Sequence, residues 1–446
     1  MSTPPPVDLA ARALDALDGA GWATVVHERS ASVVLPRGGQ LRTTAVDRTE
    51  VTFTAWRDGH LGSASTSALD ASALAAAARR AIRAADAMAA AADGPGDATP
   101  PPEPVDVEGS DGGDEETAAA ETATGLAAVQ AVRAATGDEP VAASWVHGAL
   151  TRAVAASTGL VLGERTTDAH LRVRVGAGGV RAARASGSAR AAADLDGDAL
   201  ARRALGRIPG GEWHDPTAGE QTIVLSPEAV AAILDVAGPL VFDGLAAADG
   251  RTRADGRLAT AVGSALVDLT DDPGHAGTLP RAFDASGTRK HPLRLVDAGV
   301  LASLVHDGRS RTSTGHATSP GGDARGPRPT NLVLAGGGAV DLEALVAGVE
   351  LGLLVTSIGD LRPINAELGL AYGIAAEGAS RIVDGRIAGA AGSVPLLVSP
   401  LEVLSGVEAL TVDRTLVGTP TRDGVRFGHG VLAPALRTTG GIVVTD

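Results

Sequence analysis

The chain has 446 residues, a formal net charge of −15 and no cysteine. The missing cysteine excludes disulfides, thiolate nucleophiles and Cys-ligated zinc, and the acidic balance disfavours nucleic acid, whose phosphates require a basic surface. Because the N-terminus lacks a signal pattern and no apolar run approaches roughly 18 residues, we expect a cytoplasmic protein with no membrane partner.

The first 92 residues (1–92) are predicted to form an N-terminal α+β domain. Helical spacing of leucines predicts a helix over residues 7–20, and a run of helix-forming residues predicts another over 70–92. Segments rich in β-formers lie between them, and Asp58-Gly59 separates two of these segments. This dipeptide is typical of a tight hairpin turn.

Residues 93–117 differ in composition, being acidic and rich in proline and glycine. Such a segment cannot bury a core, so we predict a flexible linker. A middle domain with mixed helices and strands is expected to follow over residues 118–216.

The third region, residues 217–446, is the longest and the richest in short strands separated by turns such as Asp384-Gly385. A helix is predicted to begin at Ser226-Pro227, because serine is a preferred N-cap and proline is favoured at the first helical position. The strand spacing predicts a mainly antiparallel, barrel-like β domain. The expected fold class is therefore α+β, with three domains and one linker.

Motif searches find little chemistry. A zinc-binding HExxH helix is absent, since the single His-Glu pair, His27-Glu28, is followed by no second histidine. Four histidines and four aspartates nevertheless fall within a short stretch: His275, His291, His306, His316, Asp271, Asp272, Asp284 and Asp307. A self-sufficient metal-dependent hydrolase built on this histidine cluster (275–316) is therefore one alternative, although the spacing is irregular.

The order of segments in the third region resembles the TldD/PmbA family, historically called modulators of DNA gyrase. The resemblance rests on the segments VDLTDDP (267–273), FDASGTRKHPLRLVDAGVLASLVHD (283–307), STGHA (313–317) followed by Asn331-Leu332, LGLLVTSI (351–358) and GLAYGIAAEGASRIVDGRIAG (369–389). Weaker similarity extends over most of the chain. The loop 313–317 is typical of the PmbA branch, also called TldE.

The TldD branch of this family resembles a zinc peptidase, with HExxxH on a helix and a cysteine as a further ligand. The positions of that motif are occupied here by Asp235, Val236 and Leu240. The resemblance therefore implies a pseudoenzyme with no catalytic residue, no metal ligand and no cofactor of its own, as in the PmbA branch.

The resemblance also implies a partner and a substrate. We expect a heterodimer with a TldD-like subunit that carries HExxxH and zinc, acting on unfolded or extended peptides. A regulatory binding protein acting on DNA topology is a further alternative, against which the acidic charge counts.

The polar segment 313–331 is predicted to be a shaped loop. Thr314, Gly315, His316 and Asn331 match the family loop and are expected to face substrate or the partner subunit. A histidine hydrogen-bonded within a turn is the competing interpretation of His316. Residues 318–330 are expected to be a variable insert with a mobile middle.

Overall fold

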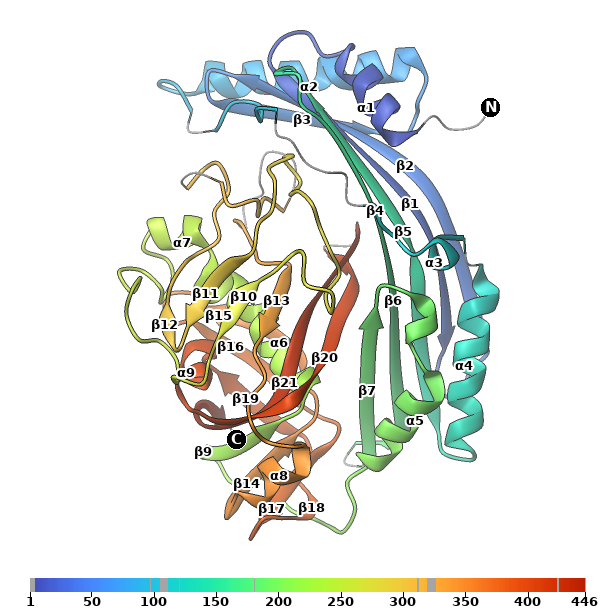
Figure 1. Cartoon of the computed structure of the whole chain (residues 1–446), viewed down its shortest axis with the longest axis vertical. Coiled ribbons are helices and arrows are strands. Elements are labelled where there is room, and N and C mark those ends of the chain that lie inside the picture. Colours follow the sequence, from blue (N-terminus) through green and yellow to red (C-terminus); the bar gives the residue numbers. More distant parts are fainter. Residues whose placement is uncertain are drawn as a thin grey trace.

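Figure 1 shows the computed structural model of the chain, which describes residues 5–96, 98–104, 111–119, 121–179, 181–310, 313–318, 326–422 and 425–445. It consists of two sheets with helices packed against them, which confirms the predicted α+β class. A long curved sheet built from the first half of the chain lies beside a β-rich region built from the second half (Figure 1).

The first sheet has the strand order β3-β2-β1-β5-β6-β4, with β7 paired to β6. All of its pairs are antiparallel except β4 with β6. Its strands are β1 (Gly21–Leu35), β2 (Arg42–Arg57), β3 (His60–Thr66), β4 (Asp111–Gly112), β5 (Val141–Ala156), β6 (Val161–Gly178) and β7 (Arg181–Ala189). Because β1 pairs with β5, segments on both sides of the predicted linker form one layer, while the predicted domain boundaries stay a prediction.

Helices cover one face of this sheet, the face that carries the odd-numbered residues of β1 such as Val25 and Val33. They are α1 (Pro6–Leu14), α2 (Ala71–Ala91), α3 (Glu115–Ala119), α4 (Thr122–Thr136) and α5 (Gly197–Gly206), with a 3₁₀ turn at Ala192–Asp194. The even-numbered Trp22 points to the opposite face, where it packs with Phe283 from the second half of the chain. The first sheet thus packs against helices on one face and, around Trp22, against the second half of the chain on the other.

Small residues let α2 lie close to the sheet. Asp70 caps the helix by accepting from the Ala73 amide, which satisfies one of its free N–H groups. A Cβ at Gly62 on β3 would lie 2.1 Å from the Ala85 nitrogen. An alanine-rich helix facing a glycine explains how a chain with 2% aromatic residues packs this layer.

The second sheet follows the path β12-β11-β10-β13-β21-β9-β14-β17-β18-β8. Off this path, β20 and β19 pair with β21, β16 pairs with β19 and β15 pairs with β16. Its strands are β8 (Glu212–Trp213), β9 (Gly219–Leu225), β10 (Leu269–Asp271), β11 (Leu293–Asp297), β12 (Val300–Leu301), β13 (Asn331–Leu334), β14 (Leu351–Val355), β15 (Gly359–Asn365), β16 (Leu370–Ala375), β17 (Ala379–Val383), β18 (Arg386–Ala390), β19 (Val394–Val398), β20 (Val407–Arg422) and β21 (Val425–Val444). Most pairs are antiparallel, as predicted, but the sheet does not close into the barrel-like form that we expected.

The core of the second region forms around α6 (Pro227–Ala237), which continues into a π-helical turn at Gly238–Phe242. The region also contains α7 (Gly244–Ala248), α8 (Leu342–Ala347) and α9 (Pro400–Ser405). Within the described ranges, no helix is long and apolar enough to span a membrane.

Two local predictions are confirmed. Arg57 pairs with His60, and Asp58 and Gly59 have φ values of 48° and 78°, as a two-residue type I′ hairpin requires. At the start of α6, Ser226 accepts from the Ala229 amide and proline occupies the first turn.

Candidate functional site

The loop residues predicted from sequence come together around one buried carboxylate, Asp271 at the end of β10. Asp271 Oδ2 lies 2.6 Å from His316 Nε2 and 3.1 Å from Lys290 Nζ. Asp271 Oδ1 accepts from the backbone amides of Thr330 and Asn331, at 2.8 and 2.6 Å. We call Asp271, Lys290, Thr314, His316 and Asn331 the Asp271 network.

The remaining predicted residues complete this network. His316 Nδ1 lies 2.8 Å from Thr314 Oγ1, and the Gly315 carbonyl accepts from Lys290 Nζ at 3.2 Å. The side-chain amide of Asn331 donates to the Leu279 carbonyl. Each of the four predicted residues is therefore part of this group of hydrogen bonds, and His316 joins the loop directly to β10.

Burial and charge fix the protonation states in the network. Burial alone raises the pKa of Asp271, but Lys290 and His316 outweigh it and hold that pKa well below its usual range. Burial, and then the nearby ammonium of Lys290, lower the pKa of His316. A neutral His316 that donates from Nε2 to an ionised Asp271 satisfies both ring nitrogens.

The loop therefore has a defined conformation, as predicted, but its histidine is not at the surface. His316 is 1% exposed, and so is Asn331. A direct contact with substrate or a partner stays a prediction, and the hydrogen-bonded arrangement of the competing interpretation is the one observed. The expected mobile middle of the 318–330 insert falls largely on residues 319–325, outside the described residues.

Three of the four histidines of the alternative metal site have separate hydrogen-bond partners, and the fourth, His291, is exposed. His275 Nδ1 accepts from the Gly277 amide, and His306 Nδ1 lies 2.8 Å from Ser310 Oγ, whereas His316 contacts Asp271. In the part of the chain that the structure describes, no group of three or more His, Cys, Asp or Glu residues is placed to hold a metal ion. These residues give a His-cluster hydrolase no geometric support.

The three positions of the HExxxH motif lie on α6 and its π-helical turn. Val236 is 6% exposed and Leu240 is fully buried, and both belong to the main hydrophobic core. The Asp235 side chain is 58% exposed, and its Oδ1 lies 3.7 Å from Nε2 of His429 on β21. A single exposed carboxylate beside two packed aliphatic side chains does not fit Zn²⁺, which takes three or four protein ligands.

A second polar cluster, which the sequence did not reveal, joins the two sheets. His170 on β6 lies 2.9 Å from Asp168 Oδ1 and 2.8 Å from Ser188 Oγ. Arg426 on β21 donates to Asp168 at 2.6 Å, and the Gly418 amide on β20 donates to Ser188. We call Asp168, His170, Ser188 and Arg426 the Asp168 cluster.

The Asp168 cluster has the residue types of a serine hydrolase but serves as a junction. Its side chains are at most 9% exposed, and the Ser188 hydroxyl already contacts His170 and a backbone amide. Burial alone would raise the pKa of Asp168, but Arg426 and His170 together lower it to about 2. A serine nucleophile needs access to substrate, which this packing does not provide.

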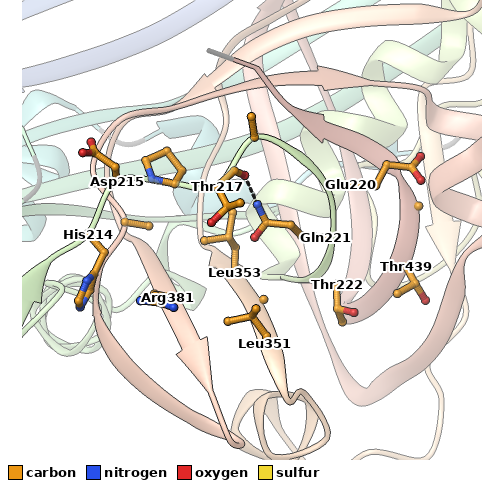
Figure 2. A pocket seen from close by; sticks show the side chains of 15 residues that line it. His214, Asp215, Thr217, Glu220, Gln221, Thr222, Leu351, Leu353, Arg381 and Thr439 are labelled. Atoms are coloured by element: carbon orange, nitrogen blue, oxygen red, sulfur yellow. Dashed lines mark hydrogen bonds between the residues drawn. The ribbon is translucent and has the colours of Figure 1, made fainter.

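A cavity of about 500 Å³ lies next to β9, and we call it the β9 pocket. It is lined by the segment 214–222, by β14, by Arg381 on β17 and by Thr439 on β21. Figure 2 shows His214 and Arg381 on one side of the cavity and Glu220 with Thr439 on the other. Leu351 and Leu353 form an apolar part of its wall.

Sequence reasoning missed the β9 pocket because its residues come from four separate strands and loops. The one local signal is the polar sequence His214-Asp215-Pro216-Thr217 beside a predicted strand, which is also typical of an ordinary surface turn. Only the pairing of β9 with β14 and of β14 with β17 places Arg381 near it.

Comparison with known proteins identifies a matching family model and a related sequence. A family model described as the PmbA/TldA metallopeptidase C-terminal domain matches residues 218–442. A Methanothermobacter thermautotrophicus protein described as a metalloprotease is 27% identical over 217 residues, which are 48% of this chain and 46% of that protein. The chain thus aligns with about half the length of this curated relative.

Solved structures match over nearly the whole chain. TldE from Thermococcus kodakarensis superimposes with a TM-score of 0.81 at 17% identity, covering 98% of this chain and 99% of that one. A Thermotoga maritima protein described as a modulator of a DNA gyrase gives 0.79 at 16% identity, covering 98% of each chain. A Bacteroides thetaiotaomicron protein with a similar description gives 0.77 at 19% identity, covering 99% and 98%. At these identities the likeness establishes the fold.

Proposed function

The chain belongs to the PmbA/TldD metallopeptidase family, and from this premise we propose that it is the non-catalytic, TldE/PmbA-like subunit of a zinc metallopeptidase complex. Its partner is a TldD-like subunit that carries HExxxH and the zinc ion. The heterodimer binds unfolded or extended peptides in the cytoplasm and cleaves them at the partner's metal.

The main observation in support of this proposal is that the HExxxH positions on α6 hold residues that cannot ligate zinc. Leu240 stands where the second histidine ligand is needed, and it is fully buried in the core. No cysteine exists in the sequence to supply a further ligand. A chain of this family that cannot assemble three zinc ligands is best explained as the supporting half of a two-subunit enzyme.

Co-expression tests the proposal. The chain is purified alone, then with a family member that carries HExxxH, and the unfolded peptide is a fluorogenic casein fragment. We expect a stable 1:1 complex whose cleavage is abolished by a chelator, with no cleavage and no stoichiometric zinc in this chain alone. Chelator-sensitive cleavage by the lone chain, with one bound zinc, would overturn the proposal.

The control is the HExxxH subunit without this chain. If that subunit cleaves the peptide equally well alone, the present chain is not a working part of the peptidase. A homodimer with another role then becomes the better explanation, and the same size-exclusion measurement reveals it.

A further inference from the structure

Three arginines lie together on β6 and β7, on the face of the first sheet that turns away from its helices. Arg172 and Arg174 are on β6, and Arg184 on β7 is directly opposite Arg174 and diagonal to Arg172. The alternate residues Leu171 and Val173 belong to the core beneath the helices, so the three arginines share the other face. We call Arg172, Arg174 and Arg184 the arginine corner.

Only two of these arginines have a carboxylate partner. Glu377, in the loop before β17, forms ion pairs with both Arg174 and Arg184. Within the described ranges, the Arg172 guanidinium makes no hydrogen bond or ion pair. Its side chain is accessible to water, yet burial of the guanidinium, and then the like charge of Arg184, lower its pKa. Arg172 is therefore a partly desolvated cation with another cation beside it.

The arginine corner has more positive than negative charge. Its three arginines face one carboxylate, which leaves an excess of two positive charges in a chain whose net charge is −15. Arg37 adds a further cation, because a Cβ at Gly178 would lie 2.8 Å from Arg37 Nη1 and 3.7 Å from Arg174 Nη2. The nearest carboxylate of α6, Glu228, is already paired with two other arginines. An anion bound here would relieve the repulsion between the guanidinium groups.

From this geometry we propose that Arg172 and Arg184, with the hydroxyls of Ser144 and Ser186, bind a phosphate group, either free phosphate or that of a phosphorylated peptide. Ser144 on β5 and Ser186 on β7 are directly opposite Arg172 on its two sides. In the part of the chain that the structure describes, neither hydroxyl has a hydrogen-bond partner. Guanidinium groups bind phosphate oxygens with paired hydrogen bonds, and serine hydroxyls are further donors.

Other ligand classes fit the arginine corner less well. A single carboxylate group would neutralise only half of the excess charge, whereas a phosphate group carries about −1.5 to −2 at pH 7. A metal cation would be repelled by the guanidinium groups. A long nucleic acid would extend beyond the arginine corner over a chain of net charge −15, which disfavours its binding.

Isothermal titration calorimetry on the full chain, at fixed ionic strength, tests the proposal. The probes are inorganic phosphate, acetate, and the peptide acetyl-Ala-phosphoserine-Ala-amide with its unphosphorylated form. We expect saturable phosphate binding at least tenfold tighter than that of acetate. Arg172→Gln should weaken it at least tenfold, and Arg172→Lys should lie between, because lysine keeps the charge without the paired donors. A phosphopeptide that binds more tightly than inorganic phosphate identifies the peptide as the source, and one that does not identifies the free ion.

The matched control is Arg42→Gln. Arg42 is an exposed arginine on the same face of the sheet, in line with Arg172 through Val34 and Ser144, and three strand spacings away, about 14 Å. Its variant should keep the phosphate affinity, and thermal melting checks that every variant is folded. Absence of saturable phosphate binding, equal binding of acetate, an unchanged affinity in Arg172→Gln or an equal loss in Arg42→Gln would each overturn the proposal. The measurement uses this chain alone, so its outcome is independent of the co-expression result.

Discussion

Asp271 Oδ2 lies 2.6 Å from His316 Nε2, and both side chains are fully buried. The other oxygen of Asp271 accepts two backbone amides at the start of β13. One carboxylate thus ties a polar, glycine-rich loop to two strands of the sheet. The loop keeps its shape because its charged groups are satisfied inside the protein rather than by water.

His316→Ala should lower the free energy of unfolding by roughly 3 kcal/mol, because it removes a charge-assisted hydrogen bond and leaves a cavity around Asp271. Urea unfolding measures the change, and exposed His291→Ala is the matched control with little expected effect. If His316→Ala were as stable as the parent while its complex lost peptide cleavage, a direct contact with substrate or partner would explain His316 better.

Asp243 makes the free energy of unfolding depend on pH with a sign opposite to that of an ion-paired carboxylate. Burial raises its pKa to about 6, against an ordinary value of 3.8. The folded state then holds the proton on Asp243 more tightly than the unfolded state does. The protonated carboxyl therefore stabilises the fold fully below about pH 4, and this stabilisation is lost as the pH rises to about 6. Each pH unit between the folded and unfolded pKa values corresponds to about 1.4 kcal/mol, so the stabilisation by protonated Asp243 amounts to roughly 3 kcal/mol.

Asp243→Asn should flatten the stability profile between about pH 4 and pH 6. The amide oxygen can keep the cap on α7, where Asp243 accepts from the Leu245 and Ala246 amides. Urea midpoints across this range measure the effect, with exposed Asp249→Asn as the control. An unchanged slope in Asp243→Asn would show that Asp243 is not the titrating group.

The sequence predicted local structure better than it predicted contacts. Asp58-Gly59 and Ser226-Pro227 were recognisable because turn and cap preferences act within four residues. The grouping of Thr314, His316 and Asn331 was found through the family resemblance, but their burial was not, because Asp271 reaches them from β10 and Lys290 from the segment before β11. Arg381 and the Asp168 cluster depend on strand pairing between remote segments, which composition and periodicity do not encode.

Arg426→Met should make the protein more sensitive to acid. Arg426 and His170 lower the pKa of Asp168 to about 2, so this carboxylate stabilises the fold above about pH 4 and ceases to do so as the pH falls to about 2. Without Arg426, only His170 opposes the effect of burial on the Asp168 carboxylate, so the pKa of Asp168 should rise. Breaking such a pair costs about 3–5 kcal/mol.

The acid-unfolding midpoint of Arg426→Met should therefore move to higher pH, and limited proteolysis should cut more readily where β21 meets the first sheet. Arg414→Met, at an exposed position on β20, is the matched control and should leave both measurements unchanged. An unshifted acid midpoint in Arg426→Met would mean that the arginine does not hold the charge on Asp168.

Rebuilding the lost motif should not rebuild an enzyme. The triple variant Asp235→His, Val236→Glu, Leu240→His restores HExxxH in sequence, but Val236 and Leu240 lie in the main core. Placing a carboxylate and an imidazole there without partners should lower stability by several kcal/mol. With no cysteine in the chain, we expect no stoichiometric zinc by metal analysis of the folded variant, and no chelator-sensitive cleavage. Zinc bound one-to-one with restored cleavage would show instead that the zinc site needs only these three side chains.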